Sequence, residues 1–259
     1  RGLVNLQYVL AAGQLLVLEA NPRASRTVPI LAKVLGFPAV RVATRLALGS
    51  TLAQLGLNPG LYPEPAHVAV KAPVFSWGKL PGVDSILGPE MKSTGEVLGI
   101  DWHFAGALAR ALEAAGLRLP ADGGTVAFSL ADRDKRRGAE TARGYAEAGL
   151  RLAATAGTAA ALDRAGLSVK AYRKLGEGSP NLVDGLAAGE VDLVINTFTR
   201  GAEPSRDGHR IRRAAVEQGV PCLTAMDTAE AVLESIRSRR AGVTLPVRAL
   251  QDYLQEGRP

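Results

Sequence analysis

Small hydroxyl residues and a glycine follow an apolar run near the middle of the sequence. Residues 152–154 are apolar, Thr155, Gly157 and Thr158 come directly after them, and a helical pattern continues to Ala165. When a parallel strand ends in this way before a helix, free backbone N–H groups and the positive end of the helix dipole point at one place, which suits a phosphate. The alternative is that Thr158 only caps the helix and Gly157 makes the turn.

Other apolar runs in this half of the chain end in similar side chains. One run precedes Ser129, another precedes Asn196 and Thr197, and a third ends two residues before Lys174. In an open parallel sheet, ligands bind in the crevice beyond the carboxyl ends of the strands. We therefore expect one anion-binding pocket of hydroxyl, amide and ammonium donors, formed by Ser129, Thr155, Thr158, Lys174, Asn196 and Thr197.

The amino-terminal part contains a carboxylate and two side-chain amides that a hairpin would bring together. Residues 4–10 and 15–19 have β-type patterns with a short Ala-Gly-Gln loop between them, which predicts a hairpin. Glu19 and Asn21 are two residues apart and share one face. A three-residue loop would place Gln7 opposite Glu19. A two-residue loop would pair Gln7 with residue 18 and weaken the cluster.

This cluster has the chemistry of a magnesium site. Carboxylate and amide oxygens suit Mg²⁺ that is held partly by substrate phosphates. Arg23 and Arg26 follow closely and would bring guanidinium groups beside the metal, where phosphoryl transfer needs positive charge. The alternative is an ordinary hairpin with a polar outer face, and the arginine pair favours the phosphoryl-transfer site.

The elements expected in the first part of the chain form a mixed α and β region. Beyond the hairpin, the patterns predict helices at residues 27–35 and 40–48 and a strand at residues 67–75. Residues 77–99 contain many turn residues and little periodicity, so we expect a long irregular loop, which is often functional. A helix with an apolar stripe is predicted at residues 102–115.

The sequence Leu-Pro-Ala-Asp-Gly-Gly at residues 119–124 is the best linker, and we place a domain border between residues 119 and 120. Beyond it, strands and helices alternate, which predicts a five-stranded parallel sheet covered on both faces by helices. The expected strands are residues 125–130, 151–154, 168–172, 192–197 and 220–224. The expected helices are residues 135–148, 158–165, 180–188, 205–218, 227–238 and 247–254.

Composition narrows the class of protein. The 259 residues are 47% hydrophobic and 22% charged, which indicates a folded chain. The net charge is +6, but the basic residues are not interleaved with aromatic residues as in proteins that bind single-stranded nucleic acid. We therefore expect the protein to bind phosphate-bearing small molecules and no nucleic acid. Cys222 is the single cysteine and cannot form an internal disulfide, which agrees with a reducing compartment. We expect it to be a buried thiol of the core. The sequence has no apolar run of about 20 residues and no leader, so we expect a cytoplasmic protein without membrane contact.

The motifs together resemble the large subunit of carbamoyl-phosphate synthetase. In the first domain they are Asn-Leu-Gln at residues 5–7, Glu-Ala-Asn-Pro-Arg at 19–23, Ser-Arg-Thr-Val-Pro at 25–29, Pro-Gly-Val-Asp at 81–84 and Leu-Gly-Pro-Glu-Met-Lys-Ser-Thr-Gly-Glu at 87–96. Residues 1–119 resemble the end of its second ATP-grasp half, which phosphorylates carbamate. Residues 120–259 resemble its regulatory domain of the methylglyoxal-synthase-like fold, through Ala-Thr-Ala-Gly-Thr at 154–158 and Ile-Asn-Thr at 195–197.

The resemblance implies roles for individual residues. Gln7, Glu19 and Asn21 match the positions that hold Mg²⁺ or Mn²⁺ against ATP, and Arg23 and Arg26 match catalytic arginines beside the nucleotide phosphates. The pocket that binds UMP as an inhibitor or IMP as an activator in bacterial members is matched by Ser129, Lys135, Thr155, Thr158, Lys174 and Asn196.

The family's activity is ATP-dependent formation of carbamoyl phosphate for pyrimidine and arginine synthesis, with a small glutaminase subunit as partner. Self-association into a homo-oligomer is left open. Because the chain starts at Arg1 and lacks the glycine-rich and adenine-contacting segments, we expect a carboxyl-terminal piece that is inactive alone.

Three departures from the family pattern change the expected regulation. Phe198 replaces a phosphate-side hydroxyl, Cys222 replaces a tyrosine, and Ala72 stands where ornithine-activated members have a glutamate. Without that carboxylate, we expect weak or absent activation by ornithine.

Two other functions remain as alternatives. A stand-alone lyase like methylglyoxal synthase would eliminate phosphate from a triose and needs a carboxylate base, for which Asp184 is the nearest candidate. Its helical pattern, however, predicts a solvent-facing side chain. The other alternative is a nucleotide sensor without catalysis.

Overall fold

The computed structural model describes residues 1–79, 87, 90–198, 207–242 and 246–255. The chain divides into two compact units, which are treated separately below. The hairpin unit comprises residues 1–68 and 247–259, and the sheet unit comprises residues 69–246. The border between residues 119 and 120, expected from the linker composition, stays a prediction. The motif residues 80–86, 88 and 89 lie outside the described part of the chain.

The hairpin unit begins with β1 (Asn5–Ala11) and β2 (Gln14–Asn21), paired antiparallel. Ala12 and Gly13 form a two-residue turn, and both have positive φ, 49° and 75°, as tight hairpin turns require. Of the two loop lengths considered, the structure has the shorter one. Gln7 nevertheless pairs with Glu19, because a bulge shifts the register between Gln7 and the next residue.

The remaining elements of the hairpin unit are helical: α1 (Thr27–Leu35), α2 (Ala39–Ala47), the short 3₁₀ turn η1 (Ala53–Leu55) and α9 (Leu250–Gln255). The carboxyl-terminal segment packs back on this unit, where Tyr253 is 6% exposed and its carbonyl oxygen lies 3.1 Å from Nδ1 of His67. Among the described residues, no single helix has the length and hydropathy of a membrane span. The helices α1 and α2 taken together reach that length and hydropathy, but they are bent by 113° at the break between them.

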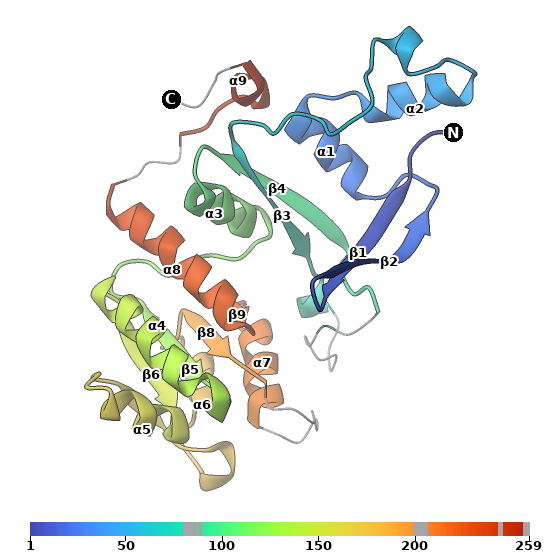
Figure 1. Ribbon diagram of the computed structural model, residues 1–259. Helices are drawn as coiled ribbons and strands as arrows, with labels where there is room; N and C mark the ends of the chain where they lie inside the picture. Colours follow the sequence, from blue (N-terminus) through green and yellow to red (C-terminus); the bar gives the residue numbers. More distant parts are fainter. Residues whose placement is uncertain (80–86, 88–89, 199–206, 243–245, 256–259) are drawn as a thin grey trace. The chain divides into compact units, whose positions relative to one another are not determined.

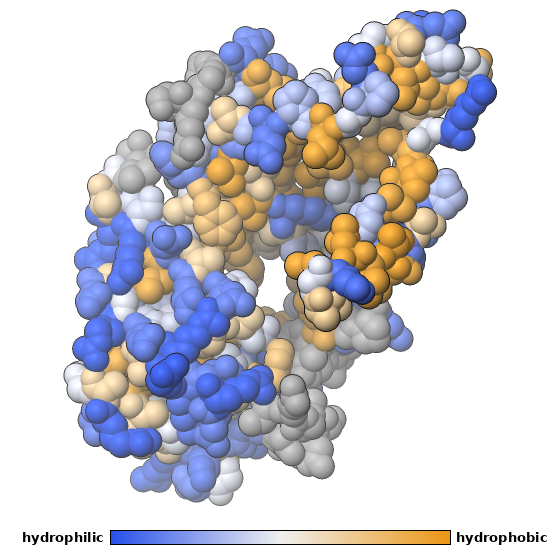
Figure 2. All heavy atoms as spheres, viewed as in Figure 1, coloured by the Kyte–Doolittle hydropathy of each residue, from blue (hydrophilic) through white to orange (hydrophobic). Residues whose placement is uncertain are grey.

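Apolar side chains of the hairpin are exposed. Leu10, Leu15 and Leu18 have exposed fractions of 73%, 66% and 64%, and Figure 2 shows hydrophobic side chains gathered over β1 and β2. Because burial of such side chains supplies most of the free energy that orders a hairpin, this element has little stability of its own.

The sheet unit opens with β3 (Val68–Val74), η2 (Trp77–Lys79), β4 (Gly95–Asp101) and α3 (Phe104–Ala114). The prediction of an irregular loop over residues 77–99 was wrong for its last residues, which belong to β4 and pair with β3. The strand begins with a glycine and contains a second one, so its sequence does not have the pattern of a strand. Gly99 is needed there, because a Cβ would lie 2.1 Å from the carbonyl oxygen of Ala107 in α3.

A five-stranded all-parallel sheet forms the centre of this unit, as predicted. Its strands are β5 (Thr125–Ser129), β6 (Arg151–Thr155), β7 (Lys170–Tyr172), β8 (Leu193–Asn196) and β9 (Cys222–Leu223). The spatial order is β7-β6-β5-β8-β9, so the chain winds outward in both directions from β5. This doubly wound order creates a crevice at the carboxyl ends of the strands on either side of β5.

Helices cover both faces of the sheet (Figure 1). They are α4 (Lys135–Glu147), α5 (Ala156–Arg164), α6 (Leu182–Ala187), α7 (Asp207–Glu217) and α8 (Met226–Arg240). Alternation along β5 explains the two layers: Val126 and Phe128 pack with α4, α5 and α8, whereas Ala127 packs with α6 and α7. Tyr145 of α4 is fully buried, and its hydroxyl donates to the carbonyl oxygen of Ala229 at 2.7 Å.

Candidate functional site

The carboxyl ends of the central strands bring several of the predicted pocket residues together. Ser129, Thr155 and Asn196 are the last residues of β5, β6 and β8. Ser129 and Asn196 are direct partners in the β5–β8 ladder. Because β6 lies on the other side of β5, the three side chains occupy one edge of the sheet.

Two buried threonines accept hydrogen bonds from the backbone that follows β5. The Leu130 N–H donates to Thr158 Oγ1 at 3.0 Å, and the Ala131 N–H donates to Thr197 Oγ1 at 2.9 Å. Thr158 and Thr197 are only 2% and 9% exposed. Since each hydroxyl accepts a backbone hydrogen bond, each keeps its own hydrogen to donate to an anion.

The start of α5 presents uncapped backbone donors at the same edge. Thr155 has extended backbone angles before the helix, and its side chain makes no capping hydrogen bond; it donates to Thr158 Oγ1 at 3.4 Å. Thr158 and Gly157 lie within the first turn, so the alternative of a Thr158 cap after a Gly157 turn is wrong. The first N–H groups of the helix are therefore left for a ligand or water.

Lys135 supplies a positive charge close to this helix start. Its ammonium lies 3.5 Å from the position that a Cβ on Gly157 would occupy. It pairs with the Asp132 carboxylate at 2.6 Å, and this contact lowers the pKa of Asp132. Because Asp132 is largely exposed, water screens the pair, and the ammonium can turn to a stronger anion.

Lys174 lies beyond the end of β7 and is less closely integrated. Its ammonium is 3.6 Å from Glu177, and its side chain is 63% exposed. Within the described residues, no hydrogen bond joins Lys174 to the other predicted pocket residues.

The structure also identifies a pocket residue that the sequence patterns missed. Arg212 of α7 is 4% exposed, and its Nη1 donates to Asn196 Oδ1 at 2.9 Å. Its guanidinium also stacks on Phe198, 4.9 Å from the ring centroid. Because arginine only donates hydrogen bonds, it fixes the Asn196 oxygen towards itself and leaves the Asn196 NH₂ as a donor. The sequence contained one signal for it. Ile211 is an apolar residue of the expected helix and would face the sheet, and Arg212 follows it at the border of that face.

In the hairpin unit, the three predicted metal ligands share one face of the hairpin. Gln7 pairs directly with Glu19, and Asn21 Nδ2 donates to Glu19 Oε1 at 2.9 Å. Arg23 follows the strand and donates to the carbonyl oxygen of Ala24 at 3.2 Å, and Arg26 precedes the first residue of α1.

These donors fit a divalent cation only in part. All three are hard oxygen ligands, but they carry one negative charge, so substrate phosphates would have to supply the rest. Across the described ranges, no group of three or more His, Cys, Asp or Glu side chains could hold a metal ion. Mg²⁺ or Mn²⁺ would be held here by Gln7, Glu19 and Asn21, and would serve to neutralise transferring phosphate charge.

Asp184, the candidate base for lyase chemistry, has a structural role. Its carboxylate accepts hydrogen bonds from the Asn181 N–H at 2.9 Å and from Ser179 Oγ at 2.7 Å, in a reciprocal cap with Asn181. Its side chain is partly exposed, and the carboxylate is engaged in this cap. These hydrogen bonds, first that of Asn181, lower the pKa of Asp184 below 3.8, which weakens it as a base.

An Asp184→Asn variant should therefore lose stability at neutral pH. The lowered pKa means that the carboxylate stabilises the fold above its ordinary pKa of 3.8 and loses this effect as the pH falls through the folded value. Thermal unfolding of both proteins between pH 7 and pH 3 measures this. The wild type should have the higher Tm at pH 7, and the gap should shrink with acid. A gap that is independent of pH would contradict this role.

Two family models match the chain in separate regions. The carbamoyl-phosphate synthase L chain, ATP binding domain, matches residues 1–55, which include the hairpin cluster. The MGS-like domain matches residues 137–224, which include Thr155, Thr158 and Asn196 but neither Ser129 nor Lys135. The five-stranded parallel sheet agrees with the second match. In this order and on these elements, the two matches are those of a carboxyl-terminal fragment of a carbamoyl-phosphate synthase large chain.

Proposed function

We propose that the sheet unit binds a nucleotide at the carboxyl edge of β5, β6 and β8 and that this binding regulates ATP-dependent synthesis of carbamoyl phosphate. The family match supports ATP-utilising ligase chemistry for the protein to which this chain corresponds. UMP as an inhibitor and IMP as an activator are the proposed effectors. The small glutaminase subunit is the proposed partner, and pyrimidine and arginine synthesis are the pathways served.

One observation carries the proposal. The uncapped start of α5 lies beside the hydroxyls of Thr155 and Thr158 and the ammonium of Lys135. These groups offer backbone donors, hydroxyl donors and a positive charge to one anion, which is the combination that binds phosphate monoesters. Phe198 and the Asn196 amide lie at the adjoining strand end, and in this proposal they contact the base or ribose.

The hairpin supplies the second half of the proposal. Gln7, Glu19 and Asn21 would hold Mg²⁺ or Mn²⁺ between the hairpin and the phosphates of ATP, and Arg23 and Arg26 would stabilise charge on the transferring phosphoryl group. In this proposal the nucleotide effector shifts an equilibrium that the ATP site also senses, with a coupling free energy of about 1 to 3 kcal/mol.

The test is a ligand titration of the chain combined with an assay for the competing lyase activity. A nucleotide that binds only the folded state raises the Tm in proportion to the logarithm of its concentration over Kd. We expect UMP or IMP to raise the Tm and to give saturable heat in calorimetry. We also expect no release of phosphate from dihydroxyacetone phosphate, because Asp184 is engaged in its helix cap.

The outcomes separate the three functions. Turnover of the triose phosphate would favour the lyase and overturn the proposal. Binding of UMP or IMP by the chain, without any effect on carbamoyl-phosphate synthesis by the full-length enzyme, would favour the sensor without catalytic coupling. If neither nucleotide changes the Tm, the pocket at the strand ends is not a nucleotide site.

A further inference from the structure

The chain passes between its two units twice. It leaves the hairpin unit after residue 68 and returns to it at residue 247, so α9 belongs to the hairpin unit although α8 belongs to the sheet unit. Pro246 is the last residue of the sheet unit. Residues 246–255, here called the carboxyl-terminal strap, therefore have one end in each unit.

Arg110 of α3 fixes the first residue of the strap within the sheet unit. Its Nη2 donates to the Pro246 carbonyl oxygen at 2.8 Å, and its Nε lies 3.2 Å from Asp101 Oδ2. Asp101 is the last residue of β4, and its carboxylate is largely buried. One guanidinium, oriented by this carboxylate, thus joins β4, α3 and the strap.

Tyr253 fixes the other end of the strap within the hairpin unit. It is the buried residue of α9, and its carbonyl oxygen lies 3.1 Å from His67 Nδ1. Its ring also meets the His67 ring edge-on, with 6.0 Å between the centroids. Val247, between the two anchors, is 98% exposed. The strap is therefore held near its ends, and solvent surrounds the side chain between them.

Leu254 packs against the carboxyl end of α1. A Cβ on Gly36, the residue that ends this helix with a φ of 64°, would lie 3.3 Å from Leu254 Cδ1. The other end of α1 begins directly after Arg26. An α-helix of nine residues is a rigid rod of about 13 Å, so a shift of Leu254 at one end is carried to Arg26 at the other.

The helix α9 has two discrete states. Its six residues are too few for a helix that is stable alone in water. The Ala249 N–H donates to Asp252 Oδ2 at 3.1 Å, which caps the helix locally, but Tyr253 is its buried residue. The helix is therefore either docked through Tyr253 or unfolded, and order–disorder segments of this kind are established switching elements.

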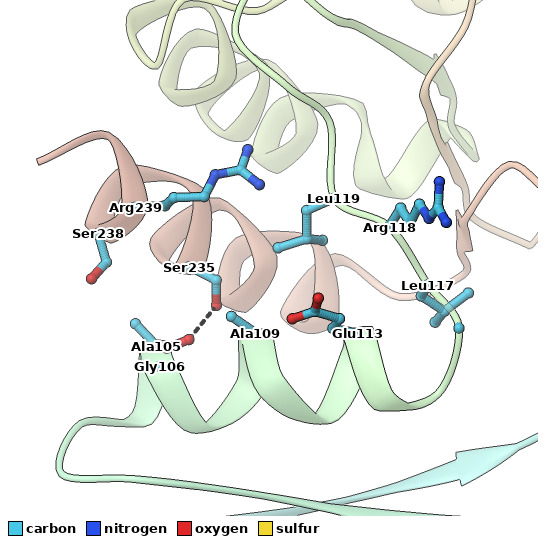
Figure 3. Close-up of a pocket in the computed structure, with 11 residues that line it drawn as sticks. Ala105, Gly106, Ala109, Glu113, Leu117, Arg118, Leu119, Ser235, Ser238 and Arg239 are labelled. Atoms are coloured by element: carbon cyan, nitrogen blue, oxygen red, sulfur yellow. Dashed lines mark hydrogen bonds between the residues drawn. The ribbon is translucent and has the colours of Figure 1, made fainter. Parts of the chain in front are cut away.

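A cavity in the sheet unit is a weaker candidate for a functional role. It lies between α3 and α8, has a volume of about 740 Å³, and is crossed by the hydrogen bond from Ser235 Oγ to the Ala105 carbonyl oxygen at 3.0 Å (Figure 3). Its charged lining residues are Glu113, Arg118 and Arg239. All three side chains are exposed, so water already solvates their charges.

We propose that the carboxyl-terminal strap positions Arg26 and that the sheet unit controls this position through Pro246. The inference rests on the proposed function for the role of Arg26 and for the effector. When α9 is docked, Leu254 supports α1 and so holds the arginine at its start. A change in the sheet unit that displaces Pro246 shifts the balance between docked and unfolded α9. Tyr253 and Leu254 are positioning residues that contact no substrate.

Hydrogen exchange on the full chain tests the strap without a ligand. Arg110→Gln releases Pro246, so the amides of residues 30–35 in α1 should exchange about ten-fold faster, as expected when one hydrogen bond from a charged donor is lost. The substitution lies in the other unit, so a purely local effect would not reach α1. Asp101→Asn is the matched control, because it removes the ion pair but leaves the hydrogen bond to Pro246. It should leave exchange in α1 as in the wild type.

Substitutions in the strap test the other anchor. Leu254→Ala should also speed exchange in α1, and Leu254→Met, which keeps the volume, should restore the slow exchange. Leu52→Ala is the control, since Leu52 lies in the same unit and is 43% exposed against 40% for Leu254. In the wild type, UMP or IMP should change exchange in α1 and α9 by at least about five-fold. Leu254→Ala should still show the nucleotide-induced rise in Tm but lose this response.

Each result decides for or against the strap. Unchanged exchange in α1 of Arg110→Gln would overturn the inference, and so would an equal change in Asp101→Asn or in Leu52→Ala, because the effect would then be general loosening. A nucleotide that raises the Tm without changing α1 and α9 would overturn the inference and leave the proposed function in place. If neither nucleotide raises the Tm, the proposed function fails, and the comparison of Arg110→Gln with Asp101→Asn alone decides whether the strap links the units.

Discussion

A Lys135→Met variant should bind UMP or IMP about 10- to 100-fold more weakly than the wild type. Lys135 brings the only ammonium that the structure places beside the first turn of α5 among the described residues. A hydrogen bond to a charged group contributes about 1.5 to 3 kcal/mol, which corresponds to this range in Kd. Calorimetric titration of both proteins at the same salt concentration measures the change, since phosphate contacts are salt-dependent.

The fold should survive this substitution. The Lys135 partner, Asp132, has a side chain that is 93% exposed, so water solvates its carboxylate when the ammonium is removed. Arg151→Gln is the matched control, because it removes the same charge from an exposed residue at the other end of β6. The control should bind nucleotide normally. Equal weakening in both variants, or unchanged binding by Lys135→Met, would exclude a direct phosphate contact of Lys135.

An Asn196→Asp variant should keep its fold and bind UMP at least about 100-fold more weakly. Asn196 is 1% exposed, and Arg212 holds its oxygen at 2.9 Å. Aspartate has the same shape, keeps an acceptor for Arg212, and places its negative charge against a buried guanidinium. It replaces the NH₂ donor by an anionic oxygen, however, so the base or ribose loses a donor and the neighbouring phosphate is repelled.

Thermal unfolding and nucleotide titration together test this prediction. The Tm should stay close to that of the wild type while the heat of UMP binding disappears. Asn58→Asp, at an exposed loop position of the hairpin unit, adds the same charge elsewhere and should change neither quantity. Normal UMP binding by Asn196→Asp would show that this side chain does not face the ligand. A collapse of the Tm would show that Arg212 does not stabilise a carboxylate at this position.

The parallel sheet and most of its elements could be predicted from the sequence. Apolar runs of four or five residues alternate with helical patterns through residues 125–238, and each run can be buried only as the strand of a covered sheet. The same patterns placed Ser129, Thr155 and Asn196 at strand ends. Since parallel strands share one carboxyl edge, this local information was sufficient to predict that these side chains would meet.

Longer-range packing decided what the patterns could not. In the hairpin, a bulge compensates for the two-residue turn and restores the pairing of Gln7 with Glu19. In the sheet unit, β4 exists because Gly99 lets the strand approach α3, although two glycines in seven residues suggest a loop.

The sequence by itself determined the family, the sheet and the edge at which polar side chains collect, because these follow from local periodicity and motifs. The tertiary structure alone decided how those side chains are used. Thr158 and Thr197 accept backbone N–H groups from the exit of β5, and Arg212 orients Asn196 from a different helix. Such contacts join residues from 16 to 66 positions apart, and hydrogen-bond direction between them depends on packing that no local pattern contains.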